Sequence, residues 1–182
     1  MLSKSQLNNL STVVKSEIPK FSLDGRIIPA KVTSVYDADT CSVVFYLEGK
    51  LVQFSIRLLG IDTPEMRPSM KKPNRDLEKK AAKRSRNRLI QLVTNVDMDV
   101  DSQYGKKKCQ TLIDKNTKII LLHCGPFDKY GRLLGTLYEF DNSKNIEKTK
   151  TGGGTSFNKQ LIQEGYAREY HGGTKQPWDF SK

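Results

Sequence analysis

Three short segments of the chain concentrate acidic, basic and hydroxyl side chains. They are Asp37-Ala-Asp39-Thr40, the run from Arg57 to Glu65, and Asp128-Lys-Tyr-Gly-Arg132. Hydrolysis of a phosphodiester needs a hard cation held by oxygen ligands, cationic donors for the charge that grows on phosphate oxygens, and a group that activates or orients water. The aspartates, arginines and glutamate of these segments meet all three needs. Arginine suits phosphate because its planar fork can bond two oxygens at once.

Each segment taken alone has a simpler structural interpretation. Asp-Ala-Asp is typical of a turn, and Asp-Lys-Tyr-Gly-Arg is typical of a β-turn. The run from Asp62 to Glu65 can start a helix or turn, because aspartate caps such starts and proline suits the first position. The presence of all three segments in one chain favours the catalytic interpretation over three unrelated turns.

Hydrophobic periodicity predicts the strands that must position these segments. Apolar residues alternate with others over 41–47 and again over 52–58, and Glu48-Gly49-Lys50 makes a turn between the two runs. With 27–36 before them, these runs predict a three-stranded antiparallel meander. Two further strands are predicted at 118–123 and 133–140.

Three helices are predicted around these strands. A short amphipathic helix precedes Pro19, a longer one covers 74–93 with Asn74 as its N-cap, and a third covers 156–164 before Gly165. On the longer helix, the predicted buried face consists of Leu77, Ala81, Ser85, Leu89 and Leu92. Three strands, a helix, two strands and a helix describe an α+β fold dominated by a five-stranded barrel of the oligonucleotide-binding (OB) class.

The predicted domain covers 26–173, between an N-terminal extension at 1–25 and a C-terminal tail at 174–182. Within it, 95–117 loses periodicity and is predicted to be an inserted loop or hairpin. An EF-hand calcium loop does not fit its aspartates, because the glycine and closing glutamate of that motif are missing. Residues 151–154 are predicted to be a flexible joint.

Composition narrows the class of protein. The chain carries 31 lysines and arginines against 20 acids, a formal net charge of +11, which is typical of proteins that bind polyanions. Nine of these cations lie between Lys71 and Arg88, although a solvated helix face explains such a run equally well. Three widely spaced cysteines argue against a disulfide scaffold or a zinc site. We expect an intracellular protein, because no signal peptide or membrane span is visible.

In their order along the chain, the three segments resemble the signature of the thermonuclease (staphylococcal nuclease-like) family. The matching patterns are Asp-x-Asp-Thr, Arg-Leu-Leu-x-(Ile/Val)-Asp-Thr-Pro-Glu and Asp-Lys-Tyr-Gly-Arg, and the resemblance covers Ile28 to Tyr170. It implies an OB barrel with packed helices. It also implies an endo- or exonuclease that uses one calcium ion (Ca²⁺), hydrolyses DNA and RNA with a preference for single strands, and leaves 3′-phosphate and 5′-hydroxyl ends. A monomer with no membrane and no obligate protein partner is expected.

The resemblance also implies roles for the matching residues. Arg57 and Arg132 correspond to the two phosphate-binding arginines, and Glu65 corresponds to the glutamate that orients the attacking water. The implied metal-site residues are Asp39, Asp62, Thr63 through its backbone carbonyl, and Asp37 as a supporting carboxylate. The implied substrate-binding residues are Lys129, Tyr130 and, by an approximate match, Tyr170.

Two features depart from the compact bacterial members of that family. The stretch between Glu65 and Asp128 is longer, and the chain ends soon after Tyr170 without room for a long final helix. The alternative function is an OB nucleic-acid-binding module whose catalysis has lapsed. Such a module is expected to lose a metal carboxylate or an arginine, because binding alone does not demand them. The complete set present here favours the enzyme.

Overall fold

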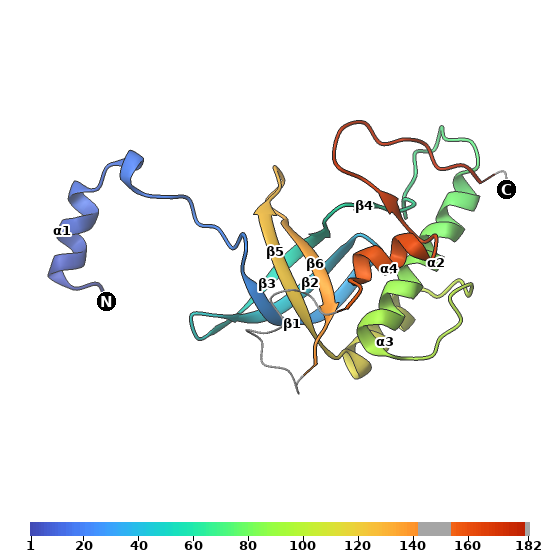
Figure 1. Ribbon diagram of the computed structural model, residues 1–182, viewed down its shortest axis with the longest axis horizontal. Helices are drawn as coiled ribbons and strands as arrows, with labels where there is room; N and C mark the ends of the chain where they lie inside the picture. The colour runs from blue at the N-terminus through green and yellow to red at the C-terminus, as the bar shows by residue number, and fades with distance from the viewer. Residues whose placement is uncertain (142–153, 181–182) are drawn as a thin grey trace.

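Five strands close into a β-barrel in the computed structural model, which describes residues 1–141 and 154–180 (Figure 1). The order around the barrel is β1 (Ile27–Asp37), β2 (Thr40–Leu47), β3 (Lys50–Leu58), β6 (Leu133–Glu139) and β5 (Ile119–Phe127). Neighbouring strands are antiparallel except β3 and β6, which pair in parallel. The predicted α+β fold with a five-stranded barrel is confirmed.

The barrel closes tightly around Gly135 on β6. A Cβ atom at this position would lie 2.7 Å from Cδ1 of Leu122 and 3.0 Å from Cγ2 of Ile56. Only glycine therefore lets side chains of β3 and β5 meet over β6. Because Ile56 precedes Arg57, this packing also fixes the end of β3 that carries the first candidate arginine.

A second, two-stranded sheet lies beside the barrel. It pairs β4 (Ile61–Asp62) with β7 (Arg168–Glu169) in antiparallel fashion. Asn158 links this region to the barrel, because its buried side-chain amide donates to the carbonyl of Leu59 at 2.9 Å and accepts from the amide of Leu137 at 3.1 Å. The Asn158 side chain thus ties the short segment between β3 and β4 to β6.

The three predicted helices are present. The first, α1 (Lys4–Thr12), begins with a capping box between Ser3 and Gln6, has no buried residue, and projects away from the barrel (Figure 1). A single 3-10 turn, η1 (Lys15–Glu17), follows it. The long helix α2 (Arg75–Thr94) packs on β1, and α4 (Phe157–Gln163) packs on β6 after its cap Ser156. No helix in 1–141 or 154–180 is long and apolar enough to cross a membrane.

The prediction of a loop or hairpin for 95–117 was wrong over half of its length. Residues Lys106–Asn116 form a further helix, α3. Its two buried residues, Cys109 and Ile113, lie one turn apart and pack with Ile90 and Met98 in a small core separate from that of the barrel. Two apolar positions among lysines were too weak a pattern to predict this helix, because its burial depends on α2 and β1.

Two details of α2 also differ from prediction. Asn74 occupies the N-cap position, but its side chain makes no capping hydrogen bond. Leu77 is 44% exposed, whereas Ser85, Leu89 and Leu92 of the predicted face are buried. The predicted joint at 151–154 lies outside the described residues except for Gly154.

Candidate active site

The turn between β1 and β2 brings two aspartates to the rim of the barrel. Asp37 pairs with Thr40 in the strand ladder, and the register of β1 shifts just before it, as at a bulge that re-aims side chains near a site. Asp37 and Asp39 are only 6% and 5% exposed, and Oδ1 of Asp37 accepts from the amide of Asp39 at 3.2 Å. Burial raises the pKa of Asp37 to about 6, although the charge of Arg57 opposes this shift.

Arg57 connects these aspartates to the next segment of the chain. Strand pairing sets it directly opposite Thr40, and its Nη1 forms an ion pair with Asp39. Its Nη2 donates to the carbonyl of Ile61 at 3.1 Å and lies 3.9 Å from Oδ1 of Asp62. Burial lowers the pKa of Arg57, and the nearby carboxylates act against this shift. The guanidinium therefore lies between two candidate metal ligands.

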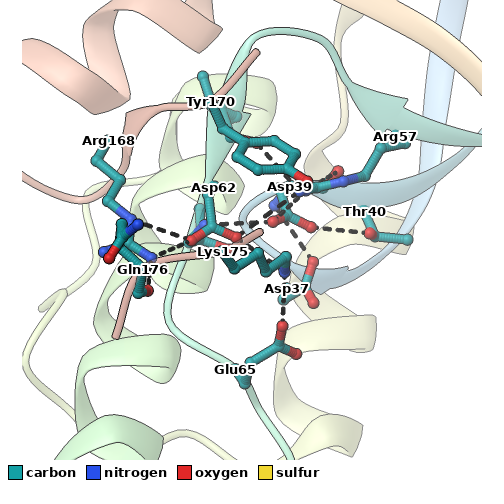
Figure 2. A network of polar contacts seen from close by, with 12 residues as sticks. Asp37, Asp39, Thr40, Arg57, Asp62, Glu65, Arg168, Tyr170, Lys175 and Gln176 are labelled. Carbon is teal, nitrogen blue, oxygen red and sulfur yellow. Dashed lines mark hydrogen bonds and ion pairs between the residues drawn. The ribbon is translucent and has the colours of Figure 1, made fainter. Parts of the chain in front are cut away.

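Asp62 is the most heavily paired carboxylate of the site (Figure 2). The pairing of β4 with β7 sets it opposite Arg168, whose Nη2 and Nε donate to its Oδ2 at 2.8 and 3.1 Å. Its Oδ1 lies 2.8 Å from Nζ of Lys175. Burial would raise the pKa of Asp62, but the hydrogen bonds from Lys175 and Arg168 outweigh burial and lower it.

The segment after β4 carries Thr63 and Glu65. The amide of Thr63 donates to Oδ2 of Asp39 at 3.3 Å, which ties the two metal-ligand segments together. The amide of Glu65 donates at 3.3 Å to the buried carboxylate of Glu78 on α2. The Glu65 carboxylate itself is about half exposed, and its Oε1 lies 2.7 Å from Nζ of Lys175. The backbone of Glu65 is thus held by a hydrogen bond to α2, whereas its carboxylate is accessible to solvent.

Arg132 approaches from the turn between β5 and β6. Its Nε and Nη2 bond to Oδ2 of Asp128 at 2.8 and 2.7 Å, so the side chain is oriented by its own turn. Its charge contributes to the lowered pKa of Arg57, which means that the two guanidinium groups lie within electrostatic range of each other. Both candidate phosphate-binding arginines therefore belong to one electrostatic environment.

The predicted substrate-binding residues occupy two places. Tyr130 is 72% exposed at the tip of the β5–β6 turn, with Nζ of Lys129 5.0 Å from its ring centre. Tyr170 follows β7, where its amide donates to the carbonyl of Gly60 at 2.9 Å and its hydroxyl donates to that of Gly173 at 2.7 Å. Lys129 and Tyr130 are accessible to a ligand, whereas the Tyr170 hydroxyl already donates to Gly173.

Comparison with known proteins decides the family. Residues 55–179 match the sequence model of the family described as staphylococcal nuclease homologue. The chain belongs to this family. Arg57, Asp62, Glu65 and Arg132 lie inside the matched range, and Asp39 precedes it.

The chain is also similar to a protein of Methanocaldococcus jannaschii described as uncharacterized. The two are 32% identical over 149 residues, which cover 77% of this chain. The chain spans 58% of the length of that relative.

Members of the staphylococcal nuclease family typically use calcium, and the donor set here suits a hard cation. Asp39 and Asp62 offer carboxylate oxygens, the ligands that calcium prefers, beside the backbone of Thr63. No group of three or more His, Cys, Asp or Glu residues is arranged to hold a metal within 1–141 and 154–180. A cation nevertheless bridges two of the acids, because the ammonium of Lys175 lies between Asp62 and Glu65 (Figure 2). The carboxylates of Asp62 and Glu65 thus already converge on a positive charge.

Sequence reasoning missed Arg168 and Lys175. Arg168 donates from Nη1 to the carbonyl of Pro177 at 3.0 Å and lies 4.5 Å over the ring of Trp178, so it holds the tail against β7. The tail lines a cavity of about 230 Å³ together with Asp62 and Glu65. The sequence feature that could have indicated a chain reversal in the tail is the pair Gly172-Gly173. In the structure their φ angles are 99° and 85°, which suit such a reversal.

Proposed function

We propose that this member of the family is an active, calcium-dependent phosphodiesterase. Its substrates are DNA and RNA, with single strands preferred, and its products carry 3′-phosphate and 5′-hydroxyl ends. The observation that carries the proposal is the joint burial of Asp39, Arg57 and Asp62 at one rim of the barrel, with the open carboxylate of Glu65 beside them. Burying acids and a cation without functional need costs free energy, because their desolvation often exceeds the Coulombic gain.

The arginines act on the phosphate in this proposal. Arg57 and Arg132 donate hydrogen bonds to the non-bridging oxygens of the scissile phosphate, and they bind the transition state more strongly because negative charge grows there. Asp128 orients Arg132 for this task, and the rim carboxylates orient Arg57. Glu65 orients the attacking water and accepts its proton, since its carboxylate is open to solvent.

Calcium would be held by Asp39, Asp62 and the backbone carbonyl of Thr63, with Asp37 in support. When bound, one such ion supplies Lewis-acid polarisation of a phosphoryl oxygen. The nucleotide next to the scissile bond is bound by Lys129 and Tyr130, whose exposed ring can stack on a base. Tyr170 joins them once its hydroxyl leaves the carbonyl of Gly173.

The alternative is a lapsed OB module that binds nucleic acid without cutting it. Incubating the purified protein with end-labelled single-stranded DNA and RNA, in calcium, magnesium or chelator, separates the two functions. We expect cleavage in calcium, none in chelator, and products with 3′-phosphate and 5′-hydroxyl ends. Binding without cleavage in any divalent metal would establish the alternative instead.

A further inference from the structure

A positively charged cavity lies next to the candidate active site, on the side of α3. Its volume is about 380 Å³, and we call it the α3 pocket. The side chains that define its chemistry are Tyr36, Met66, Arg67, Arg86, Lys106 and Gln110. No acidic residue lines it. Two residues that line the pocket are chain neighbours of candidate site residues, since Tyr36 precedes Asp37 and Met66 follows Glu65.

Arg86 is the strongest sign that the pocket binds an anion. It is only 4% exposed, yet no carboxylate of the described residues lies within ion-pairing distance of it. Its Nη2 donates to the carbonyl of Tyr104 at 2.7 Å and to Oδ1 of Asn87 at 3.2 Å, whereas its Nε makes no hydrogen bond among the described residues. Burying an arginine without a counter-charge is costly, so an anion supplied from outside would lower its free energy.

The start of α3 points to the same kind of ligand. Lys106, Lys107 and Lys108 occupy its first turn, and no side chain caps it. Three cations at a helix N-terminus oppose the helix dipole, which favours negative charge there. Neither Lys106 nor Arg67 forms an ion pair with a carboxylate in the part of the chain that the structure describes. The pocket therefore offers three uncompensated cations to one ligand.

We propose that the α3 pocket is a subsite for a phosphate and base of the nucleic-acid strand, adjacent to the phosphate that is cleaved. Arg86, Arg67 and Lys106 bind the backbone phosphate, and the ring of Tyr36, which is 49% exposed, stacks on the base. Figure 1 shows α3 far from the β5–β6 turn that carries Lys129 and Tyr130. The strand would therefore cross the rim between them, with the α3 pocket serving the opposite side of the scissile bond. This inference rests on the proposed function for the nature of its ligand.

Binding of oligothymidylates to the non-cleaving Glu65→Gln protein tests the subsite without relying on catalysis. Fluorescein-labelled strands of two, four and eight nucleotides are titrated by anisotropy at several salt concentrations. Adding Lys106→Gln should weaken binding of the longest strand about tenfold, as expected for a charge-assisted phosphate contact. It should also reduce the salt slope by about 0.7, the contribution of one phosphate on a single strand. The dinucleotide should lose less, because it cannot reach from the rim into the pocket.

Matched controls separate the pocket from general charge. Lys107→Gln removes the same charge from the same helical turn but does not line the pocket, so its effect should be smaller. Tyr36→Ala should weaken binding about tenfold through lost stacking. Tyr46→Ala removes a more exposed ring from β2, away from the pocket, and should change little. Because these four positions are on the surface, thermal unfolding is expected to stay near that of the parent.

The outcomes distinguish this inference from the proposed function. Equal losses for Lys106→Gln and Lys107→Gln in the Glu65→Gln protein, together with cleavage by the wild-type protein, would overturn the subsite and leave the nuclease standing. A selective loss for Lys106→Gln, together with no cleavage by the wild-type protein in any divalent metal, would support the subsite and overturn the nuclease. Absence of oligothymidylate binding by the Glu65→Gln protein would overturn the subsite, and absence of cleavage by the wild-type protein as well would overturn both.

Discussion

The rim site and the α3 pocket adjoin each other but treat charge in opposite ways. At the rim, Asp39, Asp62 and Glu65 each have a cation of the protein as partner. In the α3 pocket, the cations have no carboxylate partner among the described residues. A ligand at the rim must therefore displace an existing partner, whereas an anion in the pocket only adds one. Binding at the rim therefore requires an exchange of ion-pair partners, whereas binding of an anion in the pocket requires none.

The largest expected effect is on the rate of the chemical step, on substitution of Glu65. Glu65→Gln should slow the chemical step by roughly 10² to 10⁴, the usual contribution of a group that acts on water, while nucleic-acid binding persists. Single-turnover cleavage at saturating calcium and substrate measures this step alone. Glu169→Gln is the control, since its carboxylate lies on β7 outside the cavity. Cleavage by Glu65→Gln at the parent rate would remove Glu65 from the mechanism.

The two arginines should come next. Arg57→Lys and Arg132→Lys each keep the charge but lose the planar fork, so we expect a loss of about 10² to 10³ in the single-turnover rate, as for removal of one transition-state donor. Affinity for the strand should fall much less. If either variant lost affinity and rate in equal proportion, that arginine would be a binding residue in the ground state.

A smaller and opposite effect is expected from Lys175. Its pKa is raised, because the bonds to Asp62 and Glu65 outweigh burial, so the ammonium is held charged beside Asp62, which calcium would need as a ligand, and Glu65, which would orient the water. Lys175→Met should therefore increase calcium affinity about tenfold, as expected for loss of a competing charge-assisted contact. Calorimetry measures the affinity, with the exposed Lys159 changed to Met as control.

Movement of the tail gives that experiment a second readout. Trp178 is the single tryptophan of the chain and lies in the tail beside Arg168. Calcium should change its fluorescence in the parent, because the ion replaces the contact that holds Lys175 in place. An unchanged calcium affinity in Lys175→Met, together with constant fluorescence, would mean that the rim needs no exchange of partners.

The smallest expected effect is on stability, at an ion pair that takes no part in the proposed reaction. Arg88 on α2 binds both oxygens of Glu164 at 2.6 and 2.7 Å, and its hydrogen bond lowers the pKa of Glu164. Glu164→Gln should cost about 1 kcal/mol of unfolding free energy near neutral pH. A lowered folded-state pKa gives stability that is present above the ordinary pKa and lost as pH falls through the folded value. Denaturant unfolding at pH 7 and at successively lower pH should therefore show a difference that shrinks as pH falls below the ordinary pKa of glutamate.

The parts that sequence predicted well are those whose evidence is local. Alternation over 52–58 measures burial along one strand, so it located β3 and the position of Arg57 at its end. The helix α3 was missed because Ile113 is buried by Ile90 and Val35, which lie far away in sequence. The contact of Lys175 with Glu65 spans 110 residues and follows no periodicity, so Gly172-Gly173 indicates a reversal of the chain but not the residue that the tail meets.

The separate small core under α3 has a consequence for how the molecule opens. The helix lies within the connection between β4 and β5, and lengthening a loop costs little, about 0.6 kcal/mol for each doubling. The barrel can therefore keep its closure while α3 unfolds as a unit of its own, since the helix is held by a small core around Ile90, Met98, Cys109 and Ile113 and by a hydrogen bond from Gln110 to the carbonyl of Thr33. Backbone amides of Lys106–Asn116 should exchange with solvent deuterium well before those of β5, and a bound single strand should slow this exchange if the strand holds the helix in place.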